Sequence, residues 1–442
     1  MIALARNLLV FVCIACCSAG VARAAIVAPG AEKYDGVVII TQPSSVAQLT
    51  GIVVFVRAGL DRQTGPQNGL AALTAESIVR SSVSGGMSLQ DAIAANGGSI
   101  SYVIEGHDVR FYIEGAADRE SQLLALFESV LKQPQFSDAT IRAARAALNT
   151  QISYNQQNAL EVGIEMLNQQ FYGSASTGLP PSGTPAALAQ FVPADVQGFY
   201  NRNYRRGGAI VSAVGALAVN AAVSSGYVSM VQLRNLVEAL PAGTSLPSAT
   251  KVTRVHSTSR QLVARRDLSV PWLVAQFPAP ALGSRDFAPM LVLDAFIDRT
   301  LSDVASLPGV VSHTFADRAL GTIYNYNQQP ANLIIYVDGG LGDPTRNFAT
   351  ALSVVNLIGA AKLQGSIQEF KAVAQGEYSS DATTLEDRAT IAGIFAMQSG
   401  SPEYLNRTLA LIEHVTPTDL QRVVNKYLSN PTIALILPRE GS

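Results

Sequence analysis

The side chains that most often perform acid–base or metal chemistry are scarce in this chain. Its four histidines lie singly and never at the spacing of ligands to one metal ion: His107, His256, His313 and His414. A zinc site needs about three His, Cys, Asp or Glu ligands. Glu413-His414 follows Ala410, where a second ligand would be needed, so this segment is interpreted as a helix end. His107 is interpreted as a solvated residue at a hairpin tip.

Nucleophilic and phosphate-binding chemistry also lack their usual sequence signatures. No serine stands in a G-x-S-x-G turn. The pairs Gly85-Gly86 and Gly339-Gly340 are not followed by the lysine of a phosphate-binding loop. The sequence therefore offers no complete active site of these kinds.

The first 24 residues have the pattern of a secretory signal. Arg6 precedes an apolar run from Leu8 to about Ala15, and Ala22-Arg23-Ala24 resembles a cleavage site. The run is shorter than the roughly 20 residues that span a bilayer, which disfavours a membrane anchor. We therefore expect an exported, periplasmic protein. Lipid attachment at Cys16 or Cys17 is an alternative, although the residues before them make a poor lipobox.

Composition after removal of this segment excludes some classes of partner. All three cysteines, Cys13, Cys16 and Cys17, lie within it, so the mature chain would have no disulfide or thiol chemistry. Without Arg6 and Arg23, 29 basic residues stand against 33 acidic ones, a net charge of −4. Because nucleic-acid binding relies on basic surfaces, no nucleic-acid partner is expected. The remaining 418 residues suffice for two domains.

Two halves of the chain show a similar order of apolar patterns. In the first half the patterns predict strands over 51–59, 99–105, 109–114 and 209–214, and helices over 68–82, 89–95, 118–132 and 138–154. In the second half they predict strands over 273–277, 322–328, 332–338 and 433–437, and helices over 289–301, 347–362 and 367–378. A last helix begins with Thr416 as N-cap and Pro417 as its first residue.

These patterns predict an α+β fold of two tandem, homologous αββα-type domains rather than a doubly wound parallel sheet. The expected division is a signal segment over 1–24, a first domain over 25–240, a linker over 241–256 and a second domain over 257–442. The stretch Pro241 to Ser248 has the Pro, Gly and Ser content of a linker.

Five short segments, in this order, resemble the M16 peptidase family, which includes insulinase, pitrilysin and the mitochondrial processing peptidase. They are Gly69-Leu70-Ala71, Gly97-Gly98-Ser99, Pro134-Gln135-Phe136, Gly321-Thr322-Ile323-Tyr324, and Val415 to Leu420 with Lys426-Tyr427-Leu428. The resemblance covers nearly all of the chain after the signal segment. It implies antiparallel or mixed sheets with helices packed on one face.

The resemblance does not extend to the residues that bind the family's metal ion. The histidines of its His-x-x-Glu-His motif fall on Ala72 and Glu76, its catalytic glutamate falls on Ala75, and its distal glutamate ligand falls on Gln151. A methyl group neither binds zinc nor transfers a proton, and a neutral amide is a poor substitute ligand. The resemblance therefore implies a metal-free, non-catalytic member with no cofactor of its own.

In paired bacterial members of the family, the metal-free subunit supplies an arginine and a tyrosine that bind the substrate carbonyl and stabilise the oxyanion. The resemblance places that tyrosine at Tyr324. The arginine falls on Arg318, one residue after the family's position, with Arg299 as a second candidate. Donors aimed at developing negative charge contribute about 10²–10³ in rate.

The resemblance thus implies a non-catalytic subunit of an exported, heterodimeric zinc peptidase. A zinc-bearing partner would cut unfolded peptides, and this chain would supply half of the peptide chamber. Peptides would dock as an added strand on a sheet edge. Two alternatives remain open: a structural or peptide-binding scaffold with no part in hydrolysis, and a homodimer that captures peptides.

Overall fold

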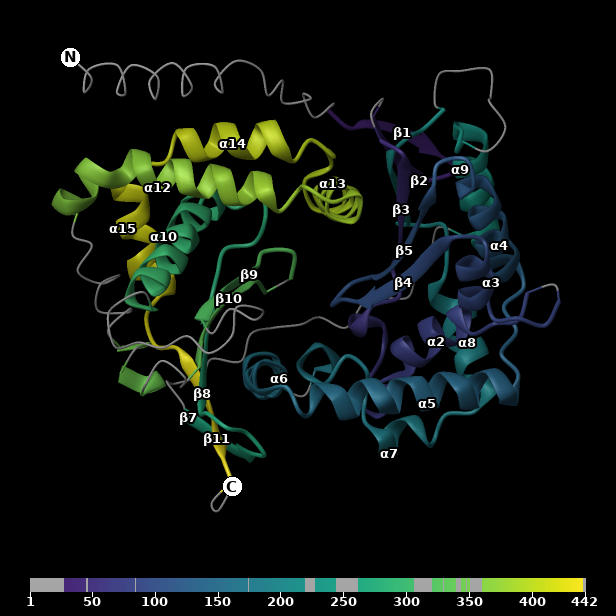
Figure 1. Cartoon of the computed structure of the whole chain (residues 1–442), viewed down its shortest axis with the longest axis horizontal. Helices are drawn as coiled ribbons and strands as arrows, with labels where there is room; N and C mark the ends of the chain where they lie inside the picture. Colours follow the sequence, from purple (N-terminus) through teal and green to yellow (C-terminus); the bar gives the residue numbers. More distant parts are fainter. Residues whose placement is uncertain are drawn as a thin grey trace, which may run out of the picture.

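The structure is a computed structural model, and the residues that it describes fall into two α+β halves (Figure 1). The described residues are 28–44, 47–83, 85–173, 175–218, 227–243, 261–305, 320–328, 330–338, 343–346, 348–349 and 360–439. The predicted signal segment, most of the helix predicted over 347–362, and much of the predicted linker lie outside them.

The first half contains a six-stranded mixed sheet in the order β1-β2-β6-β3-β5-β4. Its strands are β1 (Gly30–Tyr34), β2 (Val37–Pro43), β3 (Leu49–Val56), β4 (Gly98–Ile104), β5 (Val109–Ala116) and β6 (Ile210–Gly215). Neighbours pair antiparallel except β2 with β6, which are parallel. The four predicted strands are confirmed, whereas the β1–β2 hairpin was not predicted.

The first half contains eight helices within the described residues, and all except α6 lie on one side of this sheet (Figure 1). They are α2 (Leu70–Val79), α3 (Leu89–Ala95), α4 (Glu120–Lys132), α5 (Asp138–Asn155), α6 (Ala159–Tyr172), α7 (Pro185–Leu188), α8 (Pro193–Asn203) and α9 (Met230–Ala239). The apolar stripe predicted for the third helix is the buried side of α4, which includes Leu123, Phe127 and Leu131. Ser137 caps α5 by accepting a hydrogen bond from the Thr140 N–H.

The second half contains a five-stranded sheet in the order β7-β11-β8-β10-β9. Its elements are β7 (Gln261–Arg266), β8 (Trp272–Pro278), α10 (Phe287–Ala305), β9 (Leu320–Asn325), β10 (Asn332–Asp338), α12 (Ala360–Ser380), α13 (Leu385–Ser399), α14 (Leu405–Glu413), α15 (Pro417–Tyr427) and β11 (Thr432–Pro438). The predicted cap is confirmed, because the Thr416 hydroxyl accepts from the Asp419 N–H and Pro417 opens α15.

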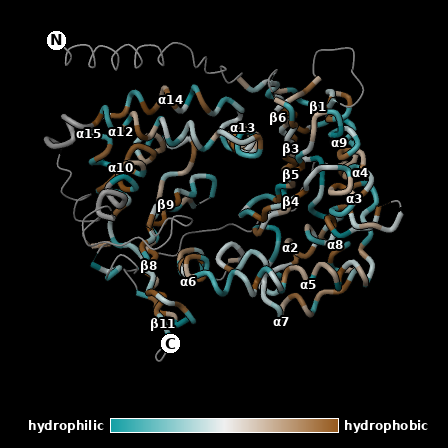
Figure 2. The backbone as a smooth tube through the Cα atoms, viewed as in Figure 1, coloured by the Kyte–Doolittle hydropathy of each residue, from teal (hydrophilic) through white to brown (hydrophobic). Residues whose placement is uncertain are grey.

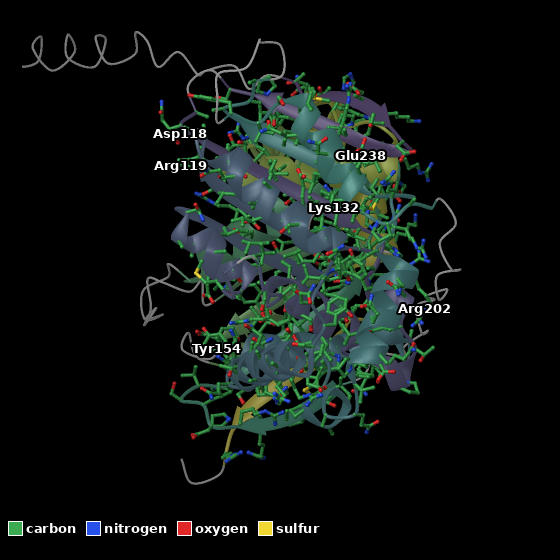
Figure 3. The ribbon with its side chains drawn as sticks, turned by 90° about the vertical axis from the view of Figure 1, so that its right-hand side faces the viewer. Asp118, Arg119, Lys132, Tyr154, Arg202 and Glu238 are labelled. Carbon is green, nitrogen blue, oxygen red and sulfur yellow. The ribbon has the colours of Figure 1, made fainter. Side chains whose placement is uncertain are left out.

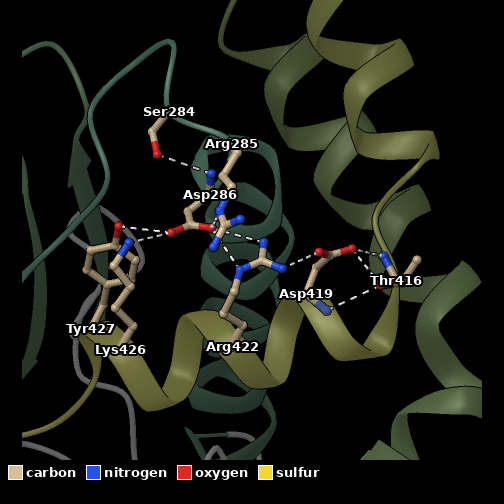
Figure 4. A network of polar contacts seen from close by, with 8 residues as sticks. All are labelled: Ser284, Arg285, Asp286, Thr416, Asp419, Arg422, Lys426 and Tyr427. Carbon is tan, nitrogen blue, oxygen red and sulfur yellow. Dashed lines mark hydrogen bonds and ion pairs between the residues drawn. The ribbon is translucent and has the colours of Figure 1, made fainter.

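A buried carboxylate ties the last helix to the first helix of this half (Figure 4). Asp286 directly precedes α10 and accepts hydrogen bonds from Arg422 Nε at 3.0 Å, Lys426 Nζ at 2.8 Å and Tyr427 Oη at 3.1 Å. Burial alone would raise the pKa of Asp286, but these hydrogen bonds outweigh it and lower the pKa. The Lys426-Tyr427 pair in the closing segment therefore serves packing.

The remaining face of each sheet is covered by a helix from the other half. The α13 helix packs on β3 and β6, and α6 packs on β8 and β11, so both helices lie between the two sheets (Figure 1). Alternation along β3 shows the division: Ile52 and Val54 join the core with the first-half helices, whereas Val53 and Phe55 contact α13. Each sheet is therefore covered on one face by helices of its own half and on the other face by a helix of the opposite half. We call these two helices, α13 on the first sheet and α6 on the second, the exchanged helices.

Hydrophobic segments follow the central strands of both sheets (Figure 2). This agrees with strands that are buried on both faces, such as β6, in which all six residues are buried. Among the described residues, none of the helices is long and apolar enough to span a membrane.

Candidate functional site

The positions that would form a metal site in the family do come together, where α2 packs against α5. Ala72 and Glu76 lie one helical turn apart on α2, and Gln151 lies on α5. All three line a cavity of about 870 Å³. Ala75 lies in the hydrophobic core and is fully buried. The positions that the family resemblance assigns to the metal ligands therefore lie together in the fold.

Glu76 is engaged by two neighbours. Its carboxylate accepts a hydrogen bond from Arg80 Nε at 2.8 Å and another from Tyr102 Oη at 2.8 Å. Arg80 lies one turn later on α2, at the i,i+4 spacing that favours ion pairs. Burial raises the pKa of Tyr102 well above its usual value, and the charge and hydrogen bond of Glu76 add to this. Tyr102 therefore stays a neutral hydrogen-bond donor to Glu76.

Gln151 is exposed and is also engaged. Its Nε2 donates to Asn155 Oδ1 at 2.9 Å, one turn later on α5. The next aromatic residue on this helix, Tyr154, which is labelled in Figure 3, has 68% of its surface exposed and also lines the cavity. The open side of the cavity thus carries an amide and an aromatic ring rather than a carboxylate.

These residues do not fit a zinc ion. The cavity wall offers one carboxylate at the family's positions, and both of its oxygens already accept hydrogen bonds. The alanines have no donor atom. Across the described residues, no group of three or more His, Cys, Asp or Glu side chains could hold a metal ion.

The edge strand β4 forms another wall of the same cavity. It pairs with β5 alone and is the last strand of its sheet. Residues Ile100 to Ile104 line the cavity, and Tyr102 links this strand to Glu76 of α2. A smaller cavity of about 190 Å³ adjoins the strand, with Val53, Tyr112 and Ile391 among its lining residues. The edge of β4 therefore lies beside two cavities.

Tyr324, one member of the predicted substrate-binding pair, lies elsewhere. Tyr324 is on β9 and is not among the residues that line the 870 Å³ cavity. Its hydroxyl donates to the Pro280 carbonyl oxygen, and its ring packs against Tyr326 and Phe287 at centroid distances of 5.5 and 6.1 Å. Burial is the main cause that raises the pKa of Tyr324 well above its usual value.

The two arginines are placed differently. Arg299 is exposed near the end of α10. Arg318 lies outside the described residues. A substrate-binding role for Arg318, Arg299 or Tyr324 stays a prediction.

Two histidine interpretations have different outcomes. His414 ends α14, as predicted, and its Nδ1 lies 2.7 Å from the Ala410 carbonyl oxygen. His107 does lie in the turn between β4 and β5, but it is half-buried rather than freely solvated, because its Nδ1 lies 2.8 Å from Oδ2 of the buried Asp61. Asp61 comes from a separate loop 46 residues earlier, so local sequence could not reveal this partner.

Sequence reasoning also missed three residues of the site: Arg80, Tyr102 and Tyr154. Arg80 had a usable signal, namely its i,i+4 spacing from Glu76 on a predicted helix. Tyr102 had none, because it reaches Glu76 from a strand 26 residues away.

Comparisons with known proteins agree with this geometry. The family model described as insulinase (peptidase family M16) matches residues 38–184, which include α2, β4 and α5. No curated protein sequence matches the chain.

Solved structures share the fold over almost the full chain. An inactive domain of peptidase M16 from Pseudomonas fluorescens is 14% identical, with a TM-score of 0.73, covering 93% of this chain and 98% of that one. A protease from Helicobacter pylori is 14% identical, with a TM-score of 0.77 and coverages of 93% and 100%. A chain of Complex III2 from Candida albicans is 12% identical, with a TM-score of 0.72 and coverages of 92% and 95%.

The sequence match spans the half that holds the α2–α5 site, and the shared fold extends over both halves. Residues 38–184 therefore match the M16 peptidase family in sequence, and the chain as a whole shares the fold of M16 structures, without the metal-binding side chains at Ala72, Glu76 and Gln151.

Proposed function

We propose that this chain is the non-catalytic subunit of a heterodimeric M16 peptidase, paired with a zinc-bearing relative. One observation supports the proposal: the three positions that the resemblance assigns to metal ligands line one cavity, where Ala72, Glu76 and Gln151 supply a methyl group, an ion-paired carboxylate and an amide. The fold is thus present without the side chains that bind a metal ion in the family. A retained, large cavity is expected of a subunit that still handles substrate.

The role of this subunit is to form half of a chamber for unfolded peptides. Peptides in extended conformation add to free sheet edges, where main-chain hydrogen bonds supply affinity. The edge strand β4 offers such a place beside the cavity. Arg318 and Tyr324 are the residues proposed to hold the substrate carbonyl for the partner's reaction.

The experiment is co-purification with a relative that carries an intact His-x-x-Glu-His motif, followed by cleavage of an unfolded peptide. We expect cleavage by the pair that exceeds that of the zinc-bearing subunit alone, and no cleavage by this chain alone. Activity of this chain alone in metal-chelated buffer would refute the division of labour. Export to the periplasm is part of the proposal, and the intact mass of the protein from whole cells tests signal removal and lipid attachment at Cys16 or Cys17.

A scaffold subunit without a part in hydrolysis is the second candidate. It is favoured by Tyr324, whose hydroxyl already donates to the Pro280 carbonyl and whose ring is packed between the halves. The fold is also shared by a chain of Complex III2 from Candida albicans. Under this alternative, the zinc-bearing relative would cut peptides equally well with and without this chain.

A further inference from the structure

We propose that a small cavity at the tip of the β4–β5 hairpin binds the ammonium group of a primary alkylamine. The cavity lies between this tip, α6, the segment 177–181 and the turn after β9. Its volume of about 60 Å³ is roughly that of two water molecules, so it admits a small polar head group. Binding there needs neither a partner subunit nor peptide cleavage, so it does not rest on the proposed function.

Close packing of the backbone holds the hairpin tip in place. The Asp61 N–H donates to the Gly106 carbonyl oxygen at 2.9 Å. A methyl group on Gly59 would lie 2.4 Å from the Asp108 nitrogen and 2.5 Å from the Glu105 carbonyl oxygen. Because only a residue without a Cβ allows this approach, Gly59 lets the two chain segments meet. The polar side chains of the tip are therefore positioned before any ligand binds.

The negative charge of Glu105, which lines the cavity, is incompletely compensated. Arg110 is shared by two carboxylates: its Nε donates to Asp108 at 2.7 Å, whereas its Nη1 reaches Glu105 only at 3.4 Å. Burial raises the pKa of Glu105 and outweighs the opposing effect of Arg110. Among the described residues, Glu105 therefore lacks a close cation of its own. A half-buried carboxylate in this position favours a bound cation.

His107 adds a second hydrogen-bond acceptor to the wall of the cavity. Its Nδ1 lies 2.8 Å from Oδ2 of Asp61, whose side chain is only 2% exposed. When Nδ1–H donates to this carboxylate, the neutral ring keeps Nε2 without a proton, and Nε2 can accept a hydrogen bond. Because Nδ1 is engaged by Asp61, Nε2 is the ring nitrogen left for a ligand.

The hydroxyl of Thr177 is a third acceptor. Its oxygen is buried and has no hydrogen-bond partner within the described part of the chain. A methyl group on Gly106 would lie 3.8 Å from Thr177 Cγ2, which places this side chain beside the hairpin tip. Tyr172 and Gln328 also line the cavity, but they already bond to each other at 2.7 Å. Because buried hydroxyls are normally paired, Thr177 indicates a missing donor.

These three acceptors match the N–H groups of an alkylammonium ion, which donates three hydrogen bonds. The charge of Glu105 favours such a cation over a neutral amide or alcohol, because charge-assisted hydrogen bonds are stronger. Across the described residues, no group of three or more His, Cys, Asp or Glu side chains could hold a metal ion. The apolar part of the wall suits the methylene groups next to the nitrogen: Leu60, Ile104, Leu179 and Pro181. A free diamine and a lysine side chain both present this group.

NMR of the purified chain, isotope-labelled in its four histidines, tests the proposal. The ligand is the diamine putrescine, and the controls are sodium and tetramethylammonium chloride at the same ionic strength. We expect a saturable shift of the His107 Nε2 signal with putrescine only, because neither control cation can donate a hydrogen bond. A His107 ring that carries both protons at neutral pH without ligand would overturn the proposal, because the histidine would then supply the missing cation.

Glu105→Gln removes the charge with little change in shape, and Glu114→Gln at the other end of the hairpin is the matched control. Both glutamates are half-buried, but Glu114 does not line this cavity. We expect Glu105→Gln to weaken putrescine binding at least about tenfold, and Thr177→Val to weaken it about twofold to tenfold. Glu114→Gln should bind as the unaltered chain does. Unchanged affinity of Glu105→Gln, or equal effects of the two glutamine variants, overturns the proposal.

Two peptides distinguish the sources of the ammonium group. One is a short, N-acetylated peptide with a single lysine, and the other is the same peptide with that lysine acetylated. Binding of the lysine peptide but not of its acetylated form supports a peptide side chain as the ligand, and binding of putrescine alone supports a free amine. No saturable shift of the His107 signal with either amine overturns the proposal. Neither result depends on cleavage by a reconstituted pair.

Discussion

Gly393 of α13 lies directly against the ring of Phe55 in β3. A methyl group on Gly393 would lie 2.2 Å from Phe55 Cε2, closer than carbon atoms can approach. The same relationship recurs in the other half, where a methyl group on Gly163 of α6 would lie 2.6 Å from Val274 Cγ2 of β8. Each exchanged helix therefore approaches the other half's sheet at a glycine, and this contact joins the two halves.

Gly393→Ala is expected to destabilise the protein by about 1–3 kcal/mol, because overpacking forces either the helix or the Phe55 ring to move. Gly163→Ala should have the same effect through Val274. Thermal or denaturant unfolding of the purified variants measures both changes.

The matched control is Gly376→Ala in α12, where nothing lies within 4 Å of the added methyl group. Because alanine is a better helix former than glycine, this variant should gain about 0.5–1 kcal/mol. If all three variants change the stability by the same amount, this would contradict the claim that Gly393 and Gly163 allow the helices to pack closely on the sheets.

Restoring ligands should restore metal binding at the α2–α5 contact. In the triple variant Ala72→His, Glu76→His, Gln151→Glu, three suitable ligands face one cavity, and we expect about one zinc ion per chain. Ala75 is left unchanged, because it lies in the core and its counterpart in the family is not a ligand.

Elemental analysis after gel filtration gives the zinc content. The double variant that keeps Ala72 is the control and should bind zinc much more weakly. Tightly bound, stoichiometric zinc in the unaltered chain would contradict our interpretation of the site.

Glu120 should make stability depend on pH. Its side chain is fully buried, and within the described residues neither carboxylate oxygen has a hydrogen-bond partner. Burial, with a smaller effect of the Glu114 charge, raises the pKa of Glu120 from 4.5 to about 9. Its stabilising contribution is therefore fully present below pH 4.5 and is lost as pH rises toward 9, by up to about 1.4 kcal/mol per pH unit.

Glu120→Gln removes this ionisation. The variant should be clearly more stable than the unaltered protein at about pH 8, with the difference vanishing near pH 4. Denaturant unfolding at several pH values measures the difference. The same substitution at the exposed Glu369 is the control, and a constant difference between pH 4 and pH 8 would contradict the prediction.

Tyr324→Phe separates the two candidate functions. Losing the hydrogen bond to the Pro280 carbonyl should cost about 0.5–1.5 kcal/mol in stability. If the hydroxyl also stabilises negative charge in the partner's reaction, kcat/KM of the reconstituted pair should fall by about 10²–10³. We expect both effects. An unaltered kcat/KM would show that Tyr324 serves packing alone, and Tyr326→Phe, in the turn just after β9, is the control.

Much of the fold was predictable where the signal is local. On either side of residues 106–108, apolar and polar residues alternate in the sequence, and these segments pair as β4 and β5. The start of α15 at Thr416-Pro417 follows from capping chemistry. The β1–β2 hairpin was missed although it carries a strong turn signal, since Asp35-Gly36 has the positive φ values of 46° and 80° that a two-residue hairpin turn requires.

The site itself was predictable in its composition but not in its contacts. That Ala72, Ala75 and Gln151 cannot hold a metal follows from the chemistry of their side chains, which no fold can alter. The bond from Tyr102 to Glu76 joins a strand to a helix across 26 residues, so it depends on how the sheet packs on α2.

By itself the sequence determined four strands of each sheet, the start of the last helix and the loss of the metal ligands, because these depend on residue types and short spacings. Only the tertiary structure decided that α6 and α13 cross to the opposite half. The uninterrupted burial of Ile52 to Val56 in β3 requires apolar cover on both faces, yet nothing local specifies which helix provides it. Contacts between residues far apart in the chain are selected by the shape of the packed surfaces, and Gly393 against Phe55 is one such fit.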